Sequence, residues 1–98
     1  MSRGEIDRIR ERIRLRQYDM SAHAMDEMAE DFLTIEDIEE AVLSGRMSRV
    51  ETDDPRGTRY IIVGTATDRQ TPVGVVGRFA SNGRYLVITV YEITAFEG

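Results

Sequence analysis

The 98-residue sequence contains no cysteine, no lysine and only one histidine. The absence of cysteine excludes disulfide bonds and thiol chemistry, and one histidine alone provides no ligand set for structural zinc. No stretch approaches the roughly 18 uncharged apolar residues of a membrane span, and the arginine-rich beginning lacks the apolar segment of a secretory signal. We therefore expect a cytoplasmic protein with no membrane contact, no metal and no cofactor.

All thirteen basic residues are arginine, and the charges are unevenly distributed. Residues 1–18 carry six arginines against three acids, residues 19–40 carry nine acids and no arginine, and residues 46–98 carry seven arginines against six acids. The net charge is −5. Arginine favours bidentate pairing with carboxylate or phosphate. Because an acidic chain binds nucleic acid poorly in general, any contact with RNA requires a local basic patch.

The length predicts a single domain over residues 1–98, and its first part has a helical pattern. Ser2 and Glu5 have the spacing of a capping box, and a narrow apolar stripe follows at Ile6, Ile9 and Ile13. This pattern predicts a peripheral, arginine-rich helix over residues 1–16, with its helical part from about residue 3. A neighbouring stripe is expected to be solvated and to pair with acids of this chain or a partner; it consists of Arg8, Arg12 and Arg16.

Two amphipathic helices are predicted next, after a segment at residues 18–20 that is either a short strand or a linker. Ser21 is the expected N-cap of the first helix, and Thr34 with Asp37 forms the capping box of the second. Gly45 is expected to end the second helix in a left-handed conformation. The expected apolar face of the first helix consists of Met25, Met28, Ala29 and Phe32, and that of the second of Ile35, Ile38, Ala41 and Val42.

The remaining sequence predicts strands over residues 46–52, 58–65, 73–79 and 84–93, which are rich in β-branched and aromatic residues. Asn82-Gly83 favours a two-residue type I′ turn between the last two strands, so that paired residue numbers sum to 165. A three-residue loop would shift the sum to 164 and separate Phe79 from Leu86, so we expect the shorter turn. The predicted fold is α+β, with about three helices on one face of a three- to four-stranded antiparallel sheet.

The predicted register places an arginine and aromatic side chains on the sheet face that the helices leave open. On this face Arg78 lies near Tyr85 and Thr89, and Tyr91 lies opposite Gly74. A guanidinium, a hydroxyl and phenol rings there could hold a phosphodiester and stack bases. Further phosphate contacts are expected from Arg46, Arg49, Arg56 and Arg59. The alternative is that these arginines pair with acids of the helices or with Asp53, Asp54 and Glu92.

His23 is a second candidate, because Asp26 and Glu27 follow it by three and four residues on the same helix. A carboxylate so placed could tune His23 as a general acid or base. The alternative is a structural histidine that hydrogen bonds to the backbone or to Glu27. Asp26 and Glu27 point in different directions around the helix, so no metal site is expected.

Several motifs resemble a widespread family of small bacterial domains of unknown function over residues 18–93. The most specific are Ser21-Ala22-His23-Ala24 and Thr89-Val90-Tyr91-Glu92, with Leu33-Thr34, Asp53-Asp54-Pro55-Arg56-Gly57 and Asn82-Gly83-Arg84 between them in order. Such domains are similar to the RelE/MqsR/BrnT superfamily of toxins. That superfamily cleaves mRNA without a metal and is neutralised by an antitoxin encoded nearby, which in this family often carries a zinc ribbon.

The resemblance implies a RelE-toxin-like fold and functional roles for His23, Arg78 and Tyr91. Two positions depart from the family pattern: relatives commonly carry histidine where this chain has Gly74, and often carry arginine where it has Asp31. Two hypotheses follow. The first is a toxin-like endoribonuclease or RNA-binding domain paired with an antitoxin. The second is a non-catalytic domain that binds protein or forms a homodimer and has lost the nuclease site.

Overall fold

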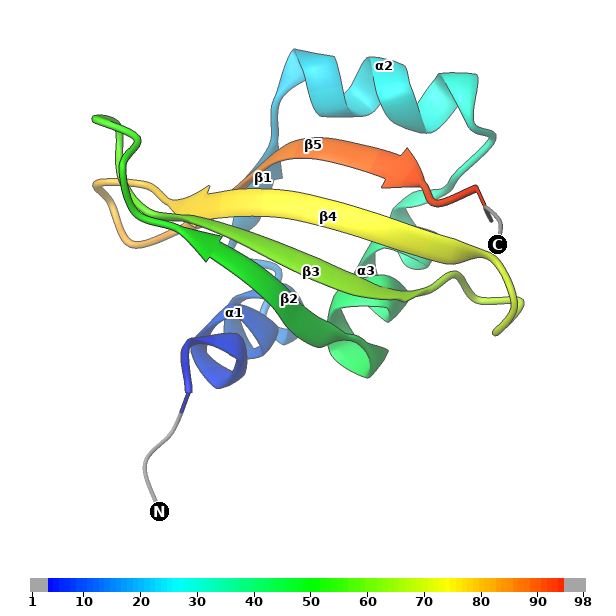
Figure 1. Cartoon of the computed structure of the whole chain (residues 1–98), viewed down its shortest axis with the longest axis horizontal. Coiled ribbons are helices and arrows are strands. Elements are labelled where there is room, and N and C mark those ends of the chain that lie inside the picture. Colours follow the sequence, from blue (N-terminus) through cyan, green and yellow to red (C-terminus); the bar gives the residue numbers. More distant parts are fainter. Residues whose placement is uncertain (1–3, 95–98) are drawn as a thin grey trace.

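The computed structural model describes residues 4–94 and has an α+β fold (Figure 1). The elements follow the order α1 (Glu5–Arg14), β1 (Tyr18–Met20), α2 (Ala22–Glu30), α3 (Ile35–Ser44), β2 (Arg46–Glu51), β3 (Arg59–Thr65), β4 (Pro72–Phe79) and β5 (Tyr85–Glu92). Within residues 4–94, no helix combines the length and the apolar character needed to cross a bilayer.

The sheet has five strands in the order β1-β5-β4-β3-β2 and is mixed. β1 pairs in parallel with β5, whereas the other neighbours are antiparallel. The prediction of three to four antiparallel strands is therefore wrong in number and in direction. The difference lies at residues 18–20, which form the short strand β1. Arg84 secures this strand, because its guanidinium donates to both carboxylate oxygens of Asp19 at 2.9 and 3.1 Å.

Helices α1 and α3 pack behind the sheet in the view of Figure 1 and enclose the core with β3, β4 and β5. The core includes Ile38 and Val42 of α3 and Val73, Val75 and Val90 of the sheet. α3 approaches β3 so closely that a methyl group on Gly64 would overlap the backbone of Ala41. This contact explains why a glycine lies inside a strand.

α1 belongs to this core, so the prediction that it is peripheral is wrong. Its narrow stripe is enough to bury Ile9 and Ile13 fully. Arg8 pairs with Glu5 at 2.8 Å and lies over the ring of Phe79, 4.4 Å from its centre. Arg12 donates to the carbonyl oxygen of Gly83 at 2.9 Å. The arginines of α1 thus tie the helix to the fold in addition to facing solvent.

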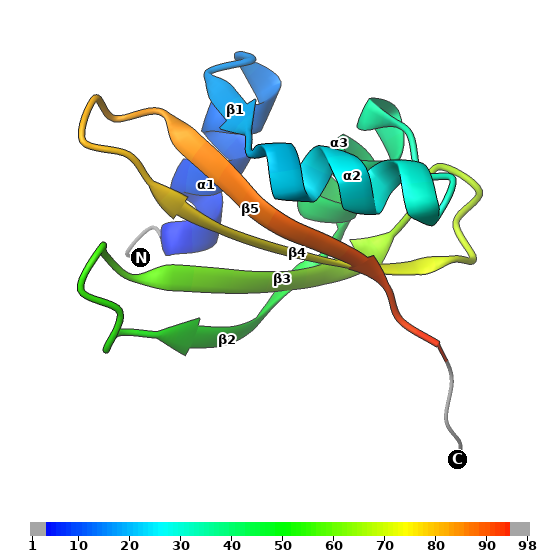
Figure 2. The same ribbon diagram turned by 90° about the horizontal axis from the view of Figure 1, so that it is seen from above.

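α2 lies along the edge of the sheet beside β5, where it continues the line of β1 (Figure 2). It buries Ala24 and Met28, whereas Met25, Ala29 and Phe32 of its predicted apolar face are exposed. Its carboxylates accept hydrogen bonds from strand amides: Glu27 from Val90 at 3.0 Å and Asp31 from Glu92 at 3.2 Å. The helix therefore satisfies β5 donors that would otherwise lie at an open edge.

The helix boundaries confirm some predicted caps and correct others. Ser21 caps α2 by accepting from the amide of Ala24, and Thr34 and Asp37 form the reciprocal capping box of α3. Gly45, however, is extended rather than left-handed. Glycine is needed there because a Cβ would overlap the carbonyl oxygens of Ala41 and Val63. α1 begins after Gly4, so its N-cap is not Ser2, which lies outside the described residues.

The β4–β5 hairpin turns through three residues rather than two. The backbone of Ala80 pairs with Arg84, and Gly83 is left-handed with φ of 87°. Paired numbers sum to 164 from Phe79–Tyr85 to Gly77–Val87 and change to 165 beyond an irregularity between Val76 and Gly77. The predicted register is correct for Val73–Val76 and wrong by one residue near the turn. Residues 85–87 therefore present the opposite faces from those predicted.

Candidate nucleic-acid interface

The sheet face opposite α1 and α3 carries a group of arginine side chains. The observed register places Arg49 opposite Ile61, Ile61 opposite Val76, and Val76 opposite Thr89 in one row across this face. Because side chains alternate along a strand, the same face also carries Arg59, Arg78 and Tyr91. We call this surface the open face. Its residues come from β2, β3, β4 and β5.

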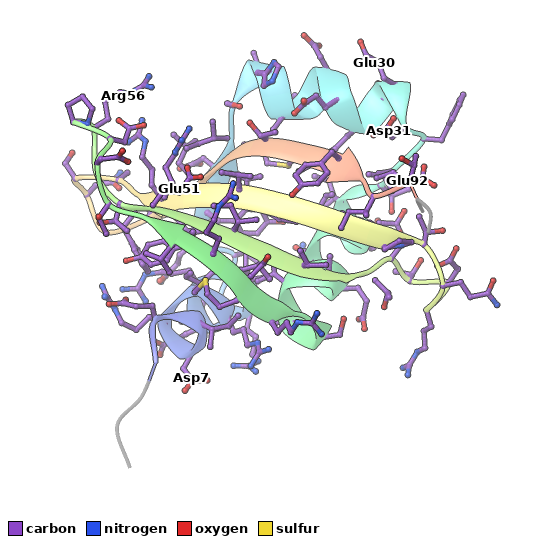
Figure 3. All side chains as sticks on the ribbon, viewed as in Figure 1. Asp7, Glu30, Asp31, Glu51, Arg56 and Glu92 are labelled. Carbon is purple, nitrogen blue, oxygen red and sulfur yellow. The ribbon has the colours of Figure 1, made fainter. Side chains whose placement is uncertain are left out.

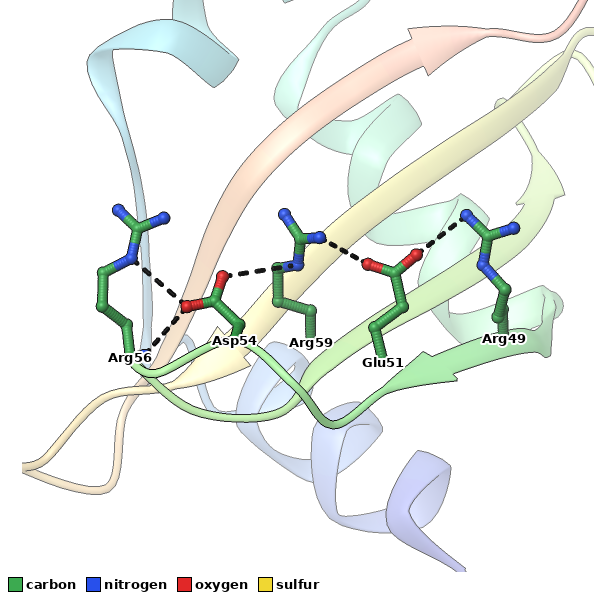
Figure 4. Close-up of polar contacts among 5 residues, drawn as sticks. All are labelled: Arg49, Glu51, Asp54, Arg56 and Arg59. Carbon is green, nitrogen blue, oxygen red and sulfur yellow. Dashed lines mark hydrogen bonds and ion pairs between the residues drawn. The ribbon is translucent and has the colours of Figure 1, made fainter.

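Five charged residues form a continuous series of ion pairs along one side of the open face (Figure 4). Arg59 lies between two carboxylates, 2.5 Å from Glu51 and 3.6 Å from Asp54. Arg49 pairs with the second oxygen of Glu51 at 2.9 Å, and Arg56 lies 3.4 Å from Asp54. Three guanidinium groups thus share two carboxylates, which leaves a net charge of +1. The predicted alternative of intramolecular pairing is correct for Arg56 and Arg59, which both contact Asp54, whereas Arg49 pairs with Glu51, a partner that was not predicted.

Asp54 is held by the turn that joins β2 to β3. The backbone amide of Arg56 donates to its carboxylate at 2.8 Å, and this bond is the main reason that the pKa of Asp54 lies below its ordinary value. The side chain and charge of Arg56, and the charge of Arg59, lower this pKa further. Asp54 is therefore ionised under ordinary conditions and remains a fixed partner for both arginines.

Arg78 and Arg59 meet at a cavity of about 190 Å³. Its lining consists of Ser21, Asp54, Arg56, Arg59, Arg78, Leu86 and Ile88. In the described part of the chain, Arg78 makes no ion pair and no side-chain hydrogen bond. Three arginines and one carboxylate around a small cavity favour a ligand that carries negative charge and accepts several hydrogen bonds. A phosphate group has these properties.

Tyr91 lies on the open face but away from Arg78, whereas Thr89 lies opposite Val76, two residues from Arg78 on β4. Tyr91 is opposite Gly74, as predicted, and its ring occupies the space where a side chain at position 74 would begin. Gly74 lies four residues before Arg78 on β4, a separation of about 13 Å along the strand. The structure therefore places Arg78 and Tyr91 at two points along one surface, and a ligand that contacts both must be extended.

The prediction that Tyr85 stacks on bases is wrong, because this residue is fully buried beneath the helices. The three-residue turn brings its ring opposite Phe79, with 5.3 Å between the ring centres in an edge-to-face arrangement. Burial raises the pKa of the phenol. A side chain at Gly77 would overlap the ring of Tyr85, so glycine creates the space that this ring fills.

His23 lies in the first turn of α2 with 66% of its side chain exposed, and its Nε2 is 3.2 Å from a carboxylate oxygen of Glu27. This contact with Glu27 is the one expected for a structural histidine. His23 does not line the cavity, although Ser21, two residues earlier, does. Arg46 is also separate, since it lines a different hollow with Gly64 and Pro72. Among residues 4–94, no three histidine, aspartate or glutamate side chains are grouped as metal ligands.

Sequence reasoning did not identify Glu51, Ser21, Leu86 or Ile88 as neighbours of the arginines. The turn sequence at residues 53–57 indicated a loop, but not that Asp54 would lie against β3. The predicted sum of 165 paired Leu86 with Phe79 and so placed Leu86 and Ile88 on the core side of the sheet, and the one-residue register change brings them to the open face instead. A pattern that is apolar at every position from 85 to 88 carries no signal that could have distinguished the two faces.

Comparison with known proteins gives one match. Residues 20–92 match the family described as a domain of unknown function, DUF4258. The match spans 73 of the 98 residues and contains every element from α2 to β5, including all residues of the cavity. No curated protein and no solved structure matches the chain.

Proposed function

The chain belongs to the DUF4258 family, and we propose that it is an RNA-binding, toxin-like domain whose open face receives a phosphodiester backbone. The observation that carries this proposal is the convergence of Arg78, Arg59 and Arg56 on one cavity, with Arg78 unpaired among the described residues. We further propose that the activity is metal-independent RNA cleavage, held in check by an antitoxin encoded nearby, as in the RelE/MqsR/BrnT toxins that the sequence resembles.

A phosphate group in the cavity would pair first with Arg78, because within residues 4–94 its guanidinium has no carboxylate partner that the phosphate would have to displace. Arg59 would then exchange part of its contact with Asp54 for the new anion, at small cost because that pair is separated by 3.6 Å. Leu86 and Ile88 exclude water from one wall, which strengthens the electrostatic contact. An RNA strand that continues along β5 would reach Thr89 and then Tyr91, on whose ring a base could stack.

For cleavage, the 2′-hydroxyl would attack the adjacent phosphorus and release the 5′-oxygen, with one proton removed and one returned. We propose His23, held by Glu27, as the group that transfers a proton, and Arg78 as the group that stabilises the charge on the phosphorane. His23 is exposed and does not line the cavity, so the RNA itself would have to bridge from the cavity to the first turn of α2.

The test is binding of a labelled single-stranded RNA to purified protein over a range of salt concentrations. We expect Arg78→Ala to weaken binding about tenfold and to reduce the salt slope by about one unit. Arg14→Ala is the matched control, because Arg14 is an exposed arginine of α1 on the other side of the sheet. Expression of the intact protein should also arrest growth, and Arg78→Ala should relieve that arrest. Absence of salt-dependent RNA affinity would reject the proposal.

A second candidate function is non-catalytic protein binding, including self-association. It is favoured by Gly74, where the resemblance implies a histidine: this chain lacks that ionisable group, and the ring of Tyr91 covers the glycine. Three measurements distinguish the two candidates: the second predicts a protein that is harmless on expression, shows no RNA affinity and is oligomeric or bound to a partner.

A further inference from the structure

A second cavity lies on the opposite side from the open face, between β1, α2 and the start of α3. It is a groove of about 640 Å³ that is open to solvent. Its lining is Arg16, Tyr18, Asp19, Met20, Met25, Met28, Ala29, Leu33 and Ile35. We call it the methionine groove. Methionine side chains adapt to varied partners, and such surfaces are common in proteins that bind helices.

One wall of the methionine groove is fixed in place. The hydroxyl of Tyr18 donates to Glu39 of α3 at 2.6 Å, so the strand and the helix that border the groove are tied together. Burial, and then this hydrogen bond, raise the pKa of Tyr18. A groove whose walls are already positioned loses little conformational freedom when a partner binds.

Phe32 gives an independent indication that this region contacts another molecule. It follows α2 and precedes Leu33 of the groove, and 92% of it is exposed. Its backbone is left-handed, with φ of 57°, a conformation that favours glycine. A phenyl ring at this position adds almost no buried apolar area, and it does not relax the backbone conformation. Strained, exposed aromatic residues are characteristic of binding surfaces rather than of packing.

The borders of the methionine groove are acidic. α2 carries Asp26 and Glu30, and α3 carries Glu36; in the described part of the chain none of these makes an ion pair. Glu30 points away from the sheet into solvent (Figure 3). The segment from residue 19 to residue 40 has nine acids and no arginine. A partner for this surface therefore needs positive charge around an apolar stripe.

We propose that the methionine groove is the docking site for a basic amphipathic helix of a partner protein. Its apolar side chains would enter between Met25, Met28 and Leu33, and its arginines or lysines would face the acids of α2 and α3. Within residues 4–94, a second copy of this chain does not provide such a helix, because the only basic helix there is α1, whose apolar residues Ile9 and Ile13 are already buried in their own fold.

Fluorescence anisotropy with three labelled synthetic peptides of about 18 residues, long enough to form a helix, tests the proposal. The first has leucines on one helical face and lysines elsewhere, the second has glutamate in place of lysine, and the third is a scramble of the first. We expect the full-length protein to bind the first peptide at least tenfold more tightly than the other two. Tighter binding than the scramble requires the apolar stripe, because both peptides carry the same charge.

Substitution of one groove residue then locates the site. Met25→Glu should weaken binding of the lysine–leucine peptide about tenfold, because it removes apolar contact; a site that recognised charge alone would instead bind this positive peptide more tightly. Val50→Glu is the matched control, since Val50 on β2 has similar exposure (45% against 56% for Met25) and is remote from the groove. Phe32→Gly should also weaken binding, and because it is expected to stabilise the fold, its effect cannot be attributed to unfolding.

Three outcomes would overturn the proposal. Equal affinity for the lysine–leucine peptide and its scramble would show that only net charge matters. Equal effects of Met25→Glu and Val50→Glu would place the site elsewhere. A dimer in sedimentation equilibrium that dissociates in Met25→Glu would show that a second copy occupies the methionine groove.

Discussion

At the scale of single residues, both α1 and α2 end with a non-glycine residue in the left-handed region. After α2, the amide of Leu33 donates to Met28 and that of Phe32 to Ala29, the two bonds of a Schellman motif. After α1, the amides of Gln17 and Arg16 make the equivalent bonds. A side chain in this conformation costs about 1–2 kcal/mol, and the sequence accepts this cost twice.

We predict that Phe32→Gly increases the free energy of unfolding by about 1 kcal/mol, because it relieves backbone strain at a residue that buries almost nothing. Urea denaturation followed by circular dichroism measures the change. Phe32→Ala is the control, since it removes the ring and keeps the Cβ, and it should leave stability close to that of the parent. An equal gain from both substitutions would assign the effect to the ring instead of the backbone.

At the scale of elements, α2 takes the position of a neighbouring strand beside β5. Ser21 begins the replacement: its amide donates to the carbonyl oxygen of Val87 and its hydroxyl to that of Ile88, at 2.9 and 2.8 Å. Glu27 and Asp31 then accept from the amides of Val90 and Glu92. These contacts explain why the acids of α2 do not simply form a solvated face opposite an apolar one.

We predict that Glu27→Ala accelerates hydrogen exchange at the amide of Val90, because this amide loses the carboxylate acceptor that it has at the sheet edge. The loss of a partner for a partly buried donor should cost about 1–3 kcal/mol of stability. Glu30→Ala is a matched control on the same helix, since Glu30 is exposed and has no ion pair in the described residues. Unchanged exchange at Val90 in Glu27→Ala would contradict the proposed role of α2.

At the scale of the whole molecule, local patterns predicted the number of helices, the last four strands and the caps at Ser21 and Thr34. These features depend on neighbours in sequence. Three other features depend on contacts between distant segments, such as Arg84 with Asp19, which no local pattern contains. These features are the pairing of β1 with the sheet, the position of α2 at the sheet edge and the burial of α1. For the same reason Asp54 was identified as a possible partner for the arginines of the open face, whereas Glu51, which pairs with both Arg49 and Arg59, was not.

Asp37 links distant parts of the fold and should make stability depend on acidity. Its carboxylate accepts hydrogen bonds from Thr34 and from the backbone and hydroxyl of Thr67, which lower its pKa to about 2. Because the folded pKa lies below the unfolded value of about 3.9, the contribution is complete above pH 4 and is lost as the pH falls towards 2.

We predict that Asp37→Asn is less stable than the parent by about 1–2 kcal/mol at pH 7, and that the difference shrinks between pH 4 and pH 2. Urea denaturation at pH 7, 4 and 2 measures it. Asp26→Asn is the control, because Asp26 is exposed and has no hydrogen bond in the described residues, and it should show no such convergence. A constant difference across the three pH values would contradict the assignment.

Two registers are compatible with the sequence at the tip of the β4–β5 hairpin, and the observed pairing changes from one to the other between Val76 and Gly77. Residues 85–88 are Tyr, Leu, Val and Ile, so either alternate pair could fill the core. The ring of Tyr85 occupies the space above Gly77, and this contact favours the observed register. A methyl group at position 77 would displace this ring and favour the other register. Leu86 and Ile88 would then turn towards the core, and Tyr85 and Val87 would be exposed on the open face.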